Sequence, residues 1–291
     1  MPGPLRLMAV HAHPDDESSK GAASAARYVR EGISVLVVTC TGGERGDVLN
    51  PGLDLTHTPD GLAVLRRLEM ARAAEILAVD HTWLGFEDSG YPEGDPKPPL
   101  PQGCFAQLPL AVATAPLTAL IRSYRPHVVT TYDEHGGYPH PDHIRTHEVT
   151  IAAIEDAARP ASDGVVGWQV SKLYYHMTFH KPKLVALHEA ALASGIDSPY
   201  EEWLANWEDR PHDADRVTTR VPCAEFFGLR DDALRAHASQ IDPAGRWFSL
   251  PLDLQAQVWP TEDYQLARAW IPATVPEDDL FSGLRNAESE S

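Results

Sequence analysis

The chain has 291 residues, which is enough for one large domain or two ordinary ones with an ample core. Apolar residues make up 43% and charged residues 23%, which is typical of a globular protein rather than a disordered or membrane-embedded one. The 24 basic and 42 acidic residues give a formal net charge of −18. This charge repels phosphate and anionic lipid, so it argues against nucleic acid and membrane surfaces as partners.

The sequence shows no signal for export or for a membrane span, so we expect a cytoplasmic protein. The first residues, MPGPLRLMAVHAHPDD, lack a charged region followed by a sustained apolar one, and no run approaches the ~18 apolar residues of a membrane span. Three cysteines, Cys40, Cys104 and Cys223, are too few and too scattered for a disulfide framework or a CxxC zinc site. We expect them to be core thiols.

The residue pattern predicts strands that alternate with helices. Short apolar and β-branched runs predict strands at residues 5–10, 33–39, 82–84, 127–132 and 172–176. Helical periodicity predicts helices at residues 18–31, 61–78, 108–124, 142–157, 182–193, 224–239 and 262–269. Residues 90–103 contain five prolines and are expected to form a loop. The strand at 172–176 is expected to be the last of the core.

This alternation predicts an α/β fold with a mainly parallel sheet flanked by helices on both faces. The pattern weakens in the last third of the chain. We therefore expect an α/β core at residues 1–182 and a helical and irregular cap at 183–291, packed on the core within one structural domain.

Three polar clusters each follow a predicted strand: HAHPDDE, TGGERGD and YDEHGGYPHPDH. Ligands of parallel α/β sheets bind beyond the carboxyl ends of the strands, so the three clusters should line one crevice. The first cluster offers His11, His13, Asp15, Asp16 and Glu17; the third offers Asp133, Glu134, His135, Tyr138, His140, Asp142, His143 and His147. Imidazole with carboxylate is the ligand set of catalytic zinc.

Each loop also has an ordinary structural interpretation. Asp15, Asp16 and Glu17 could only complement a helix N-terminus, an effect of ~0.3–1 kcal/mol. GGYPHPDH could be a turn with polar decoration. However, HxHPDD and HPDH both present His and Asp within one turn, follow a strand and precede a helix. This coincidence predicts a metal site shared by the two loops.

HAHPDDE, TGGERG and GGYPHPDH resemble the zinc-dependent deacetylases of N-acetylglucosaminyl lipids and inositol glycosides, the PIG-L or LmbE-like family. The closer likeness within it is to the mycothiol S-conjugate amidases of actinobacteria, carried also by HTWLGFEDSG, SKLYY, RVTTRV and RDDALRAHASQIDP. The resemblance covers most of residues 5–270. It implies a Rossmann-like fold and one zinc ion per subunit held by His13, Asp16 and His143. The ligand set also suits Fe²⁺ or Co²⁺.

The neighbours of these ligands suit amide hydrolysis. Asp15 is placed to take a proton from metal-bound water, whose pKa zinc lowers towards ~7. His140 and Tyr138 are candidates to stabilise the oxyanion, and a protonated His140 could donate to the leaving amine. Asp142 could orient His140. No nucleophilic side chain is needed, and GxSxG is absent from the sequence.

Four further residues are candidates for substrate binding. Asp47, Arg66 and Asp88 match positions that contact sugar or inositol hydroxyls in the resembling deacetylases, and Lys20 matches the amidase branch. Carboxylate and guanidinium groups can each engage two adjacent hydroxyls. The ordinary interpretations are a surface helix residue for Arg66, a turn cap for Asp88 and a solvated lysine for Lys20.

The resemblance implies cleavage of mycothiol S-conjugates to a mercapturate and glucosaminyl inositol, a detoxification of electrophiles. Two alternatives share the mechanism: deacetylation of N-acetylglucosaminyl inositol, and an amidase acting on a thiol conjugate in antibiotic biosynthesis. A sugar-binding protein without catalytic activity is a further alternative. It is disfavoured because Asp15 and His140 would then have no chemical role. A nicotinamide dehydrogenase is disfavoured because the first strand leads into HAHPDD rather than GxGxxG. A homo-oligomer is compatible with the sequence.

Overall fold

The computed structural model describes residues 4–53, 59–160, 164–208 and 215–285, and within them one sheet has the strand order β3-β2-β1-β4-β5-β7-β6. The strands are β1 Arg6–His11, β2 Ser34–Thr41, β3 Asp80–Phe86, β4 Val128–Thr131, β5 Lys172–His176, β6 Thr219–Pro222 and β7 Thr261–Ala269. Strands β1 to β5 run parallel to one another, while β7 runs antiparallel to β5 and β6. The order 3-2-1-4-5 is that of a Rossmann-like sheet, as the sequence predicts.

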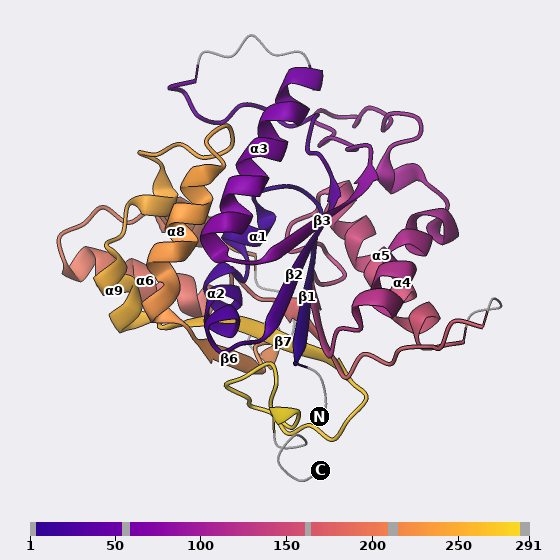
Figure 1. Ribbon diagram of the computed structural model, residues 1–291. Helices are drawn as coiled ribbons and strands as arrows, with labels where there is room; N and C mark the ends of the chain where they lie inside the picture. The colour runs from indigo at the N-terminus through magenta and orange to yellow at the C-terminus, as the bar shows by residue number, and fades with distance from the viewer. Residues whose placement is uncertain (1–3, 54–58, 161–163, 209–214, 286–291) are drawn as a thin grey trace.

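Helices cover both faces of this sheet (Figure 1). They are α1 Asp16–Ser19, α2 Ala22–Arg30, α3 Pro59–Leu77, α4 Leu110–Tyr124, α5 Pro141–Ala157, α6 Lys181–Ala193, α7 Glu201–Ala205, α8 Phe227–Ala236 and α9 Leu252–Val258. On one face α4 and α5 bury Leu117 and Val149 against β1, β2 and β4. On the other, α2, α3 and α8 pack together around Ala73 and Phe227. Both faces of the central strands are therefore covered, which is why β1 and β2 are apolar almost throughout.

The prediction of a helix at residues 262–269 is wrong, because these residues lie in strand β7. Glu, Gln, Leu, Ala and Arg are good helix formers, and they dominate this segment. Pairing with β5 along Lys172↔Ala269 to His176↔Tyr264 overrides that preference. Strand β5 is thus not the last of the core. The C-terminal region adds two strands to the sheet besides its helices, and the sheet crosses residue 183, where the cap was predicted to begin.

The single helix predicted at residues 18–31 is divided into α1 and α2. The break lies at Lys20, which is extended, and Gly21, which has a φ of +91°. A Cβ atom on Gly21 would lie 2.7 Å from the imidazole carbon Cε1 of His176, so only glycine fits there. The break leaves Asp16 and Glu17 on a separate short helix beside the end of β1.

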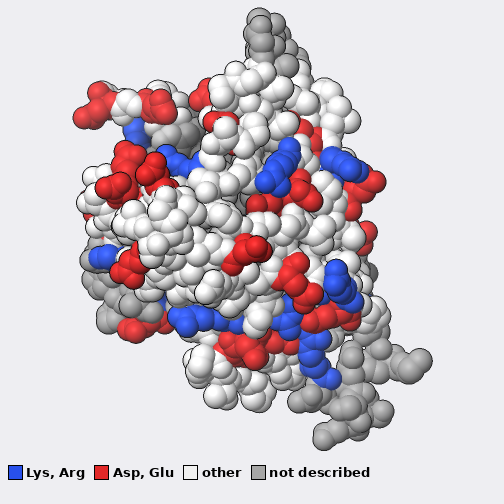
Figure 2. Space-filling model, turned by 90° about the vertical axis from the view of Figure 1, so that its left-hand side faces the viewer, with Lys and Arg blue, Asp and Glu red and all other residues white. Residues whose placement is uncertain are grey.

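The surface and the cysteines agree with the sequence. Cys40, Cys104 and Cys223 are free and buried. In Figure 2, acidic and basic side chains are interspersed among uncharged ones on the face that carries the C-terminal helices. Within the described ranges, no helix is long and apolar enough to cross a membrane.

A buried ion pair joins β5 to the C-terminal segment. The Lys172 ammonium, whose side chain is fully buried, lies 2.5 Å from Oε1 of Glu277, and the Tyr174 hydroxyl donates to Oε2. Burial makes each charge dependent on the other, because an unpaired buried charge is costly.

We expect Glu277→Ala to lower the free energy of unfolding by about 3–5 kcal/mol, because it leaves the Lys172 ammonium buried without its partner. Urea denaturation measures this change. The double variant Lys172→Met with Glu277→Leu is the control and should recover most of the loss. A single variant as stable as the wild type would contradict this account of the pair.

Candidate metal centre and active site

The centre lies where the loops after β1 and β4 meet. Strands β1 and β4 are parallel neighbours, so their carboxyl ends point to the same edge of the sheet. Imidazole Nε2 of His13, in the first loop, lies 3.3 Å from Oδ2 of Asp142, at the start of α5. The second cluster, which begins at Thr41, the last residue of β2, joins them, because the Thr41 amide donates to the carbonyl of Ala12. The three polar clusters therefore lie together, as predicted.

His13, Asp16 and His143 form one buried group whose potential ligand atoms all lie within 4.8 Å of one another. Oδ2 of Asp16 lies 3.3 Å from Nε2 of His143 and 3.6 Å from Nδ1 of His13. Two imidazoles and one carboxylate are enough to hold a catalytic metal ion and leave a coordination position open.

The hydrogen bonding of His143 indicates that a cation belongs here. Its Nδ1 lies 2.9 Å from the carbonyl oxygen of Gly136, which can only accept, so Nδ1 carries the hydrogen in the neutral ring. The lone pair of Nε2 then faces the Asp16 carboxylate, and Nε2 is buried without a hydrogen-bond partner among the described residues. A bound cation would satisfy both acceptors, as would a proton on Nε2, and burial favours such a positive charge beside the carboxylate.

Three buried carboxylates surround His13. Its Nε2 faces Oδ2 of Asp142 and Oδ1 of Asp88, at 3.3 and 3.6 Å, while Nδ1 faces Asp16. Burial alone lowers the pKa of His13, but its hydrogen bonds with Asp142, Asp16 and Asp88 outweigh it and hold this pKa well above the usual value. This concentration of negative charge suits a dication, and a hydrogen on Nε2 leaves Nδ1 as the metal-binding atom.

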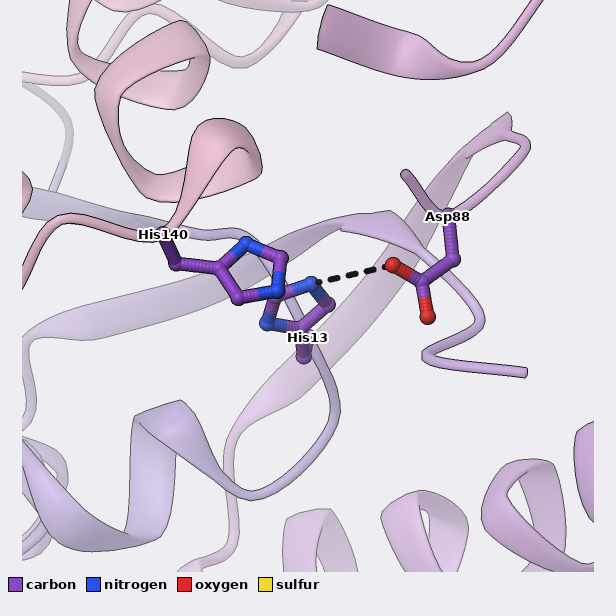
Figure 3. Close-up of side chains that lie close together, drawn as sticks. All are labelled: His13, Asp88 and His140. Carbon is purple, nitrogen blue, oxygen red and sulfur yellow. Dashed lines mark ion pairs between the residues drawn. The ribbon is translucent and has the colours of Figure 1, made fainter. Parts of the chain in front are cut away.

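A second group of possible ligands consists of His13, Asp88 and His140 (Figure 3). The figure shows the rings of His13 and His140 beside each other, with the Asp88 carboxylate across from Nε2 of His13. In this second group, His13 would have to bind the metal through Nε2, the atom that faces Asp88. Nε2 already faces the carboxylates of both Asp88 and Asp142. The first group is therefore the better metal site, and the second places His140 next to it.

Asp15 has a strained backbone beside the metal group, with a φ of +104°. Its amide donates to Oε2 of Glu17 at 2.9 Å, and its carboxylate lies 3.4 Å from the Arg66 guanidinium. Burial raises the pKa of Asp15, and the charge of Arg66 opposes this. A raised pKa makes the carboxylate a stronger base.

Glu17 in turn is held by His237, from the C-terminal end of α8, at 2.7 Å. Both side chains are buried. This ion pair fixes the Glu17 carboxylate that receives the Asp15 amide. No role is predicted for His237 from the sequence. Its segment, RDDALRAHASQIDP, contributed to the family resemblance, but its spacing carries no sign of a contact 220 residues away.

His140 and Tyr138 lie on the open side of the centre. His140 caps α5, and its Nδ1 accepts from the Asp142 amide at 3.1 Å, so the hydrogen of the neutral ring is on Nε2. Burial lowers the pKa of His140 to about 3, with charge on His13 and His143 acting in the same direction. Near pH 7 His140 is then neutral and can donate the hydrogen on Nε2. This form suits the predicted role of stabilising an oxyanion better than the predicted role of protonating the amine. Tyr138 is 47% exposed, and its ring lies 4.5 Å from that of His143.

Asp142 is bound differently from the prediction. Its carboxylate accepts from Ser89 and faces His13, and only its backbone amide contacts His140. Asp142 therefore orients the metal group through its side chain and His140 through its backbone. Tyr132 was also missed by sequence reasoning: its hydroxyl donates to Oδ2 of Asp16 at 2.7 Å. A tyrosine that ends an apolar strand has no local signature of such a role.

The four predicted substrate-binding residues lie in different settings. Lys20 pairs with Oδ1 of Asp16 at 2.8 Å, and Asp88 is buried against His13. Asp47 is exposed on the loop after β2. Arg66 is buried, and it donates to the carbonyls of Gly43 and Pro14 at 2.6 Å. Arg66 thus ties two loops of the centre together, and a direct contact with substrate stays a prediction.

The family follows from comparison with known proteins. The family model PIG-L, described as GlcNAc-PI de-N-acetylase, matches residues 8–154. The chain belongs to the PIG-L family. It is 55% identical over 287 residues to the mycothiol S-conjugate amidase of Streptomyces coelicolor, covering 97% of this chain and 98% of that protein. It is 39% identical over 293 residues to 1D-myo-inositol 2-acetamido-2-deoxy-alpha-D-glucopyranoside deacetylase of Streptomyces avermitilis, covering 96% and 97%.

Solved structures of deacetylases share the fold of this PIG-L protein. N,N'-diacetylchitobiose deacetylase of Pyrococcus horikoshii aligns with a TM-score of 0.62 at 19% identity, over 90% of this chain and 83% of that one. A zinc-inhibited form of teicoplanin deacetylase aligns with a TM-score of 0.54 at 17% identity, over 90% and 97%. At these identities the likeness supports the Rossmann-like fold alone.

We expect His13→Ala and His143→Ala to lose bound metal without unfolding, because the core strands do not depend on these side chains. Metal content after zinc loading and desalting, together with the thermal midpoint, measures both effects. His135→Ala is the matched control, since His135 is exposed on the loop that leads into α5, the helix of His143. Wild-type metal stoichiometry in both site variants would contradict the assignment.

Proposed function

We propose that this protein is a zinc-dependent amidase that cleaves mycothiol S-conjugates to a mercapturate and glucosaminyl inositol. The observation that carries the proposal is the 55% identity to a mycothiol S-conjugate amidase across 97% of this chain. The buried His13, Asp16 and His143 group supports a hydrolytic metal centre with one ion per subunit. Location in the cytoplasm stays a prediction.

The proposed ligands are Nδ1 of His13, a carboxylate oxygen of Asp16 and Nε2 of His143. Zinc bound there would polarise the amide carbonyl and acidify a water molecule, and Fe²⁺ would supply the same chemistry. The chain contributes the orientation of the ligands. Gly136 fixes the tautomer of His143, Asp142 fixes that of His13, and Lys20 and Tyr132 hold the Asp16 carboxylate.

The proposed proton transfers use Asp15. The Asp15 carboxylate takes a proton from the attacking water. Glu17 holds the backbone amide of Asp15, and the Arg66 guanidinium lies beside the Asp15 carboxylate. Nε2–H of the neutral His140 and the Tyr138 hydroxyl donate to the oxygen that becomes negative as water adds to the carbonyl. Because His140 is neutral near pH 7, the proton taken up by Asp15 is the one available to the leaving amine nitrogen.

The substrate has two arms, joined at the amide. We assign the glucosaminyl inositol arm to the loops after β2 and β3, which carry Asp47 and Asp88. These loops also present Glu44, Arg45 and Glu87, so this side of the centre offers charged partners for hydroxyl groups. Lys20 is proposed to contact the substrate near the metal on the opposite side.

Deacetylation of N-acetylglucosaminyl inositol is the alternative, because the chain is also 39% identical to such a deacetylase. The difference in identity favours the amidase. Lys20, which matches the amidase branch, lines the cleft beside the metal group and thus lies where an acyl arm longer than acetyl would pass.

We expect the zinc-loaded protein to release amine faster from a mycothiol S-conjugate than from N-acetylglucosaminyl inositol when the two are offered side by side. The metal-free protein is the control and should release none. Faster release from the acetylated glycoside would make the protein a deacetylase with the same catalytic residues. No amine release from either substrate would overturn the proposed function.

We expect Asp15→Asn to lower kcat by about 10²–10⁴-fold, since the variant cannot take the proton from water. Asparagine tolerates positive φ better than most residues, so the strained backbone should persist. Metal content should equal that of the wild type, which separates loss of the base from loss of the site. A kcat near that of the wild type would exclude Asp15 as the base.

A further inference from the structure

The metal group lies between two walls of different chemistry. The loops after β2 and β3 form one wall, and they are rich in charged side chains such as Arg45, Glu87 and Asp88. The loop after β5 and part of the C-terminal region form the other. Because β2 and β5 lie on opposite sides of β1 in the sheet, the two walls flank the centre from opposite sides.

A cleft of about 1280 Å³ opens on the β5 side. Lys20, Tyr132 and Tyr138, which surround the metal group, line one end of it. The segment from His176 to Pro182 and residues near α7 line the rest. This volume is far larger than an acetyl group needs, and it is large enough to hold a ligand of drug size.

Three aromatic side chains that lie together line this cleft: Phe179, Trp203 and Trp247, here called the aromatic wall. The ring of Phe179 lies 5.2 Å from that of Trp203, edge to face, and 5.7 Å from that of Trp247. Phe179 is 37% and Trp247 is 36% exposed. Exposed aromatic rings gathered in a cleft mark a surface that binds an apolar group.

Other contacts fix this wall in place. The Arg246 guanidinium lies over the ring of Trp203, 5.3 Å from its centre. Phe179 stands between the two tryptophans and only three residues after strand β5. The wall is therefore attached to the rigid sheet at one end and to the C-terminal region at the other, so it is preorganised for a ligand.

We propose that the S-substituent of the conjugate binds against the aromatic wall, which makes Trp203 and Trp247 determinants of specificity for bulky, aromatic S-substituents. The inference rests on the proposed amidase function and extends it. The acyl arm carries the sulfur and its substituent, and that substituent is the apolar part of the substrate. The polyol arm suits the charged wall, so the cleft beside Lys20 and Tyr138 is left for the acyl arm.

The test compares S-benzyl and S-methyl conjugates of mycothiol with the zinc-loaded wild type, Trp203→Ala and Trp247→Ala. Both variants should lose about tenfold in kcat/KM for the benzyl conjugate, mainly through KM, and less than about twofold for the methyl conjugate. Trp247→Phe should regain most of the loss. N-acetyl-S-benzylcysteine, a product that contains only the acyl arm, should inhibit both alanine variants about tenfold more weakly.

Trp270→Ala is the matched control. The exposed fraction of Trp270, 38%, is similar to that of Trp247, 36%. Trp270 follows β7 at the opposite end of the sheet, where its amide donates to the carbonyl of Ser171. It should leave both conjugates unaffected. Equal losses for the benzyl and methyl conjugates in the cleft variants, or none, would overturn the subsite alone. A wild type that cleaves neither conjugate would overturn the proposed function and the subsite with it.

Discussion

The active site is organised around one electrostatic constraint, the approach of two buried acceptors at 3.3 Å: the Asp16 carboxylate and Nε2 of His143. Neither can donate to the other once Gly136 has fixed the tautomer of His143. A bound cation would satisfy both groups, and hydrogen bonds from Lys20 and Tyr132 hold the Asp16 carboxylate in place. The contacts that would orient these side chains around a metal ion are therefore already formed.

The sheet topology explains why so many polar groups can be buried here. The strand order puts the carboxyl ends of β1, β2 and β4 side by side, so three polar loops satisfy one another instead of facing water. Asp142, for example, contacts three residues: its side chain contacts His13 and Ser89, and its backbone amide donates to His140. A parallel sheet alone would position the loops, but these cross-contacts orient the rings.

The C-terminal region reaches the site in two ways. His237 holds Glu17 and, through it, the strained backbone of Asp15, the proposed base. Trp203 and Trp247 come from the same region and bound the cleft. Relatives that share the metal loops could therefore differ in the acyl groups they accept by changing this region, without altering the ligands.

The sequence by itself determined the strand–helix alternation, the three polar loops and the residues of the proposed metal group, which lie together in the fold, because these depend on local periodicity and on residue types within one turn. The tertiary structure decided the rest. It made residues 261–269 a strand by pairing them with β5, turned the Asp142 side chain towards His13, and buried Arg66 on two backbone carbonyls. Each outcome depends on contacts between distant segments, which leave no periodic trace in the chain.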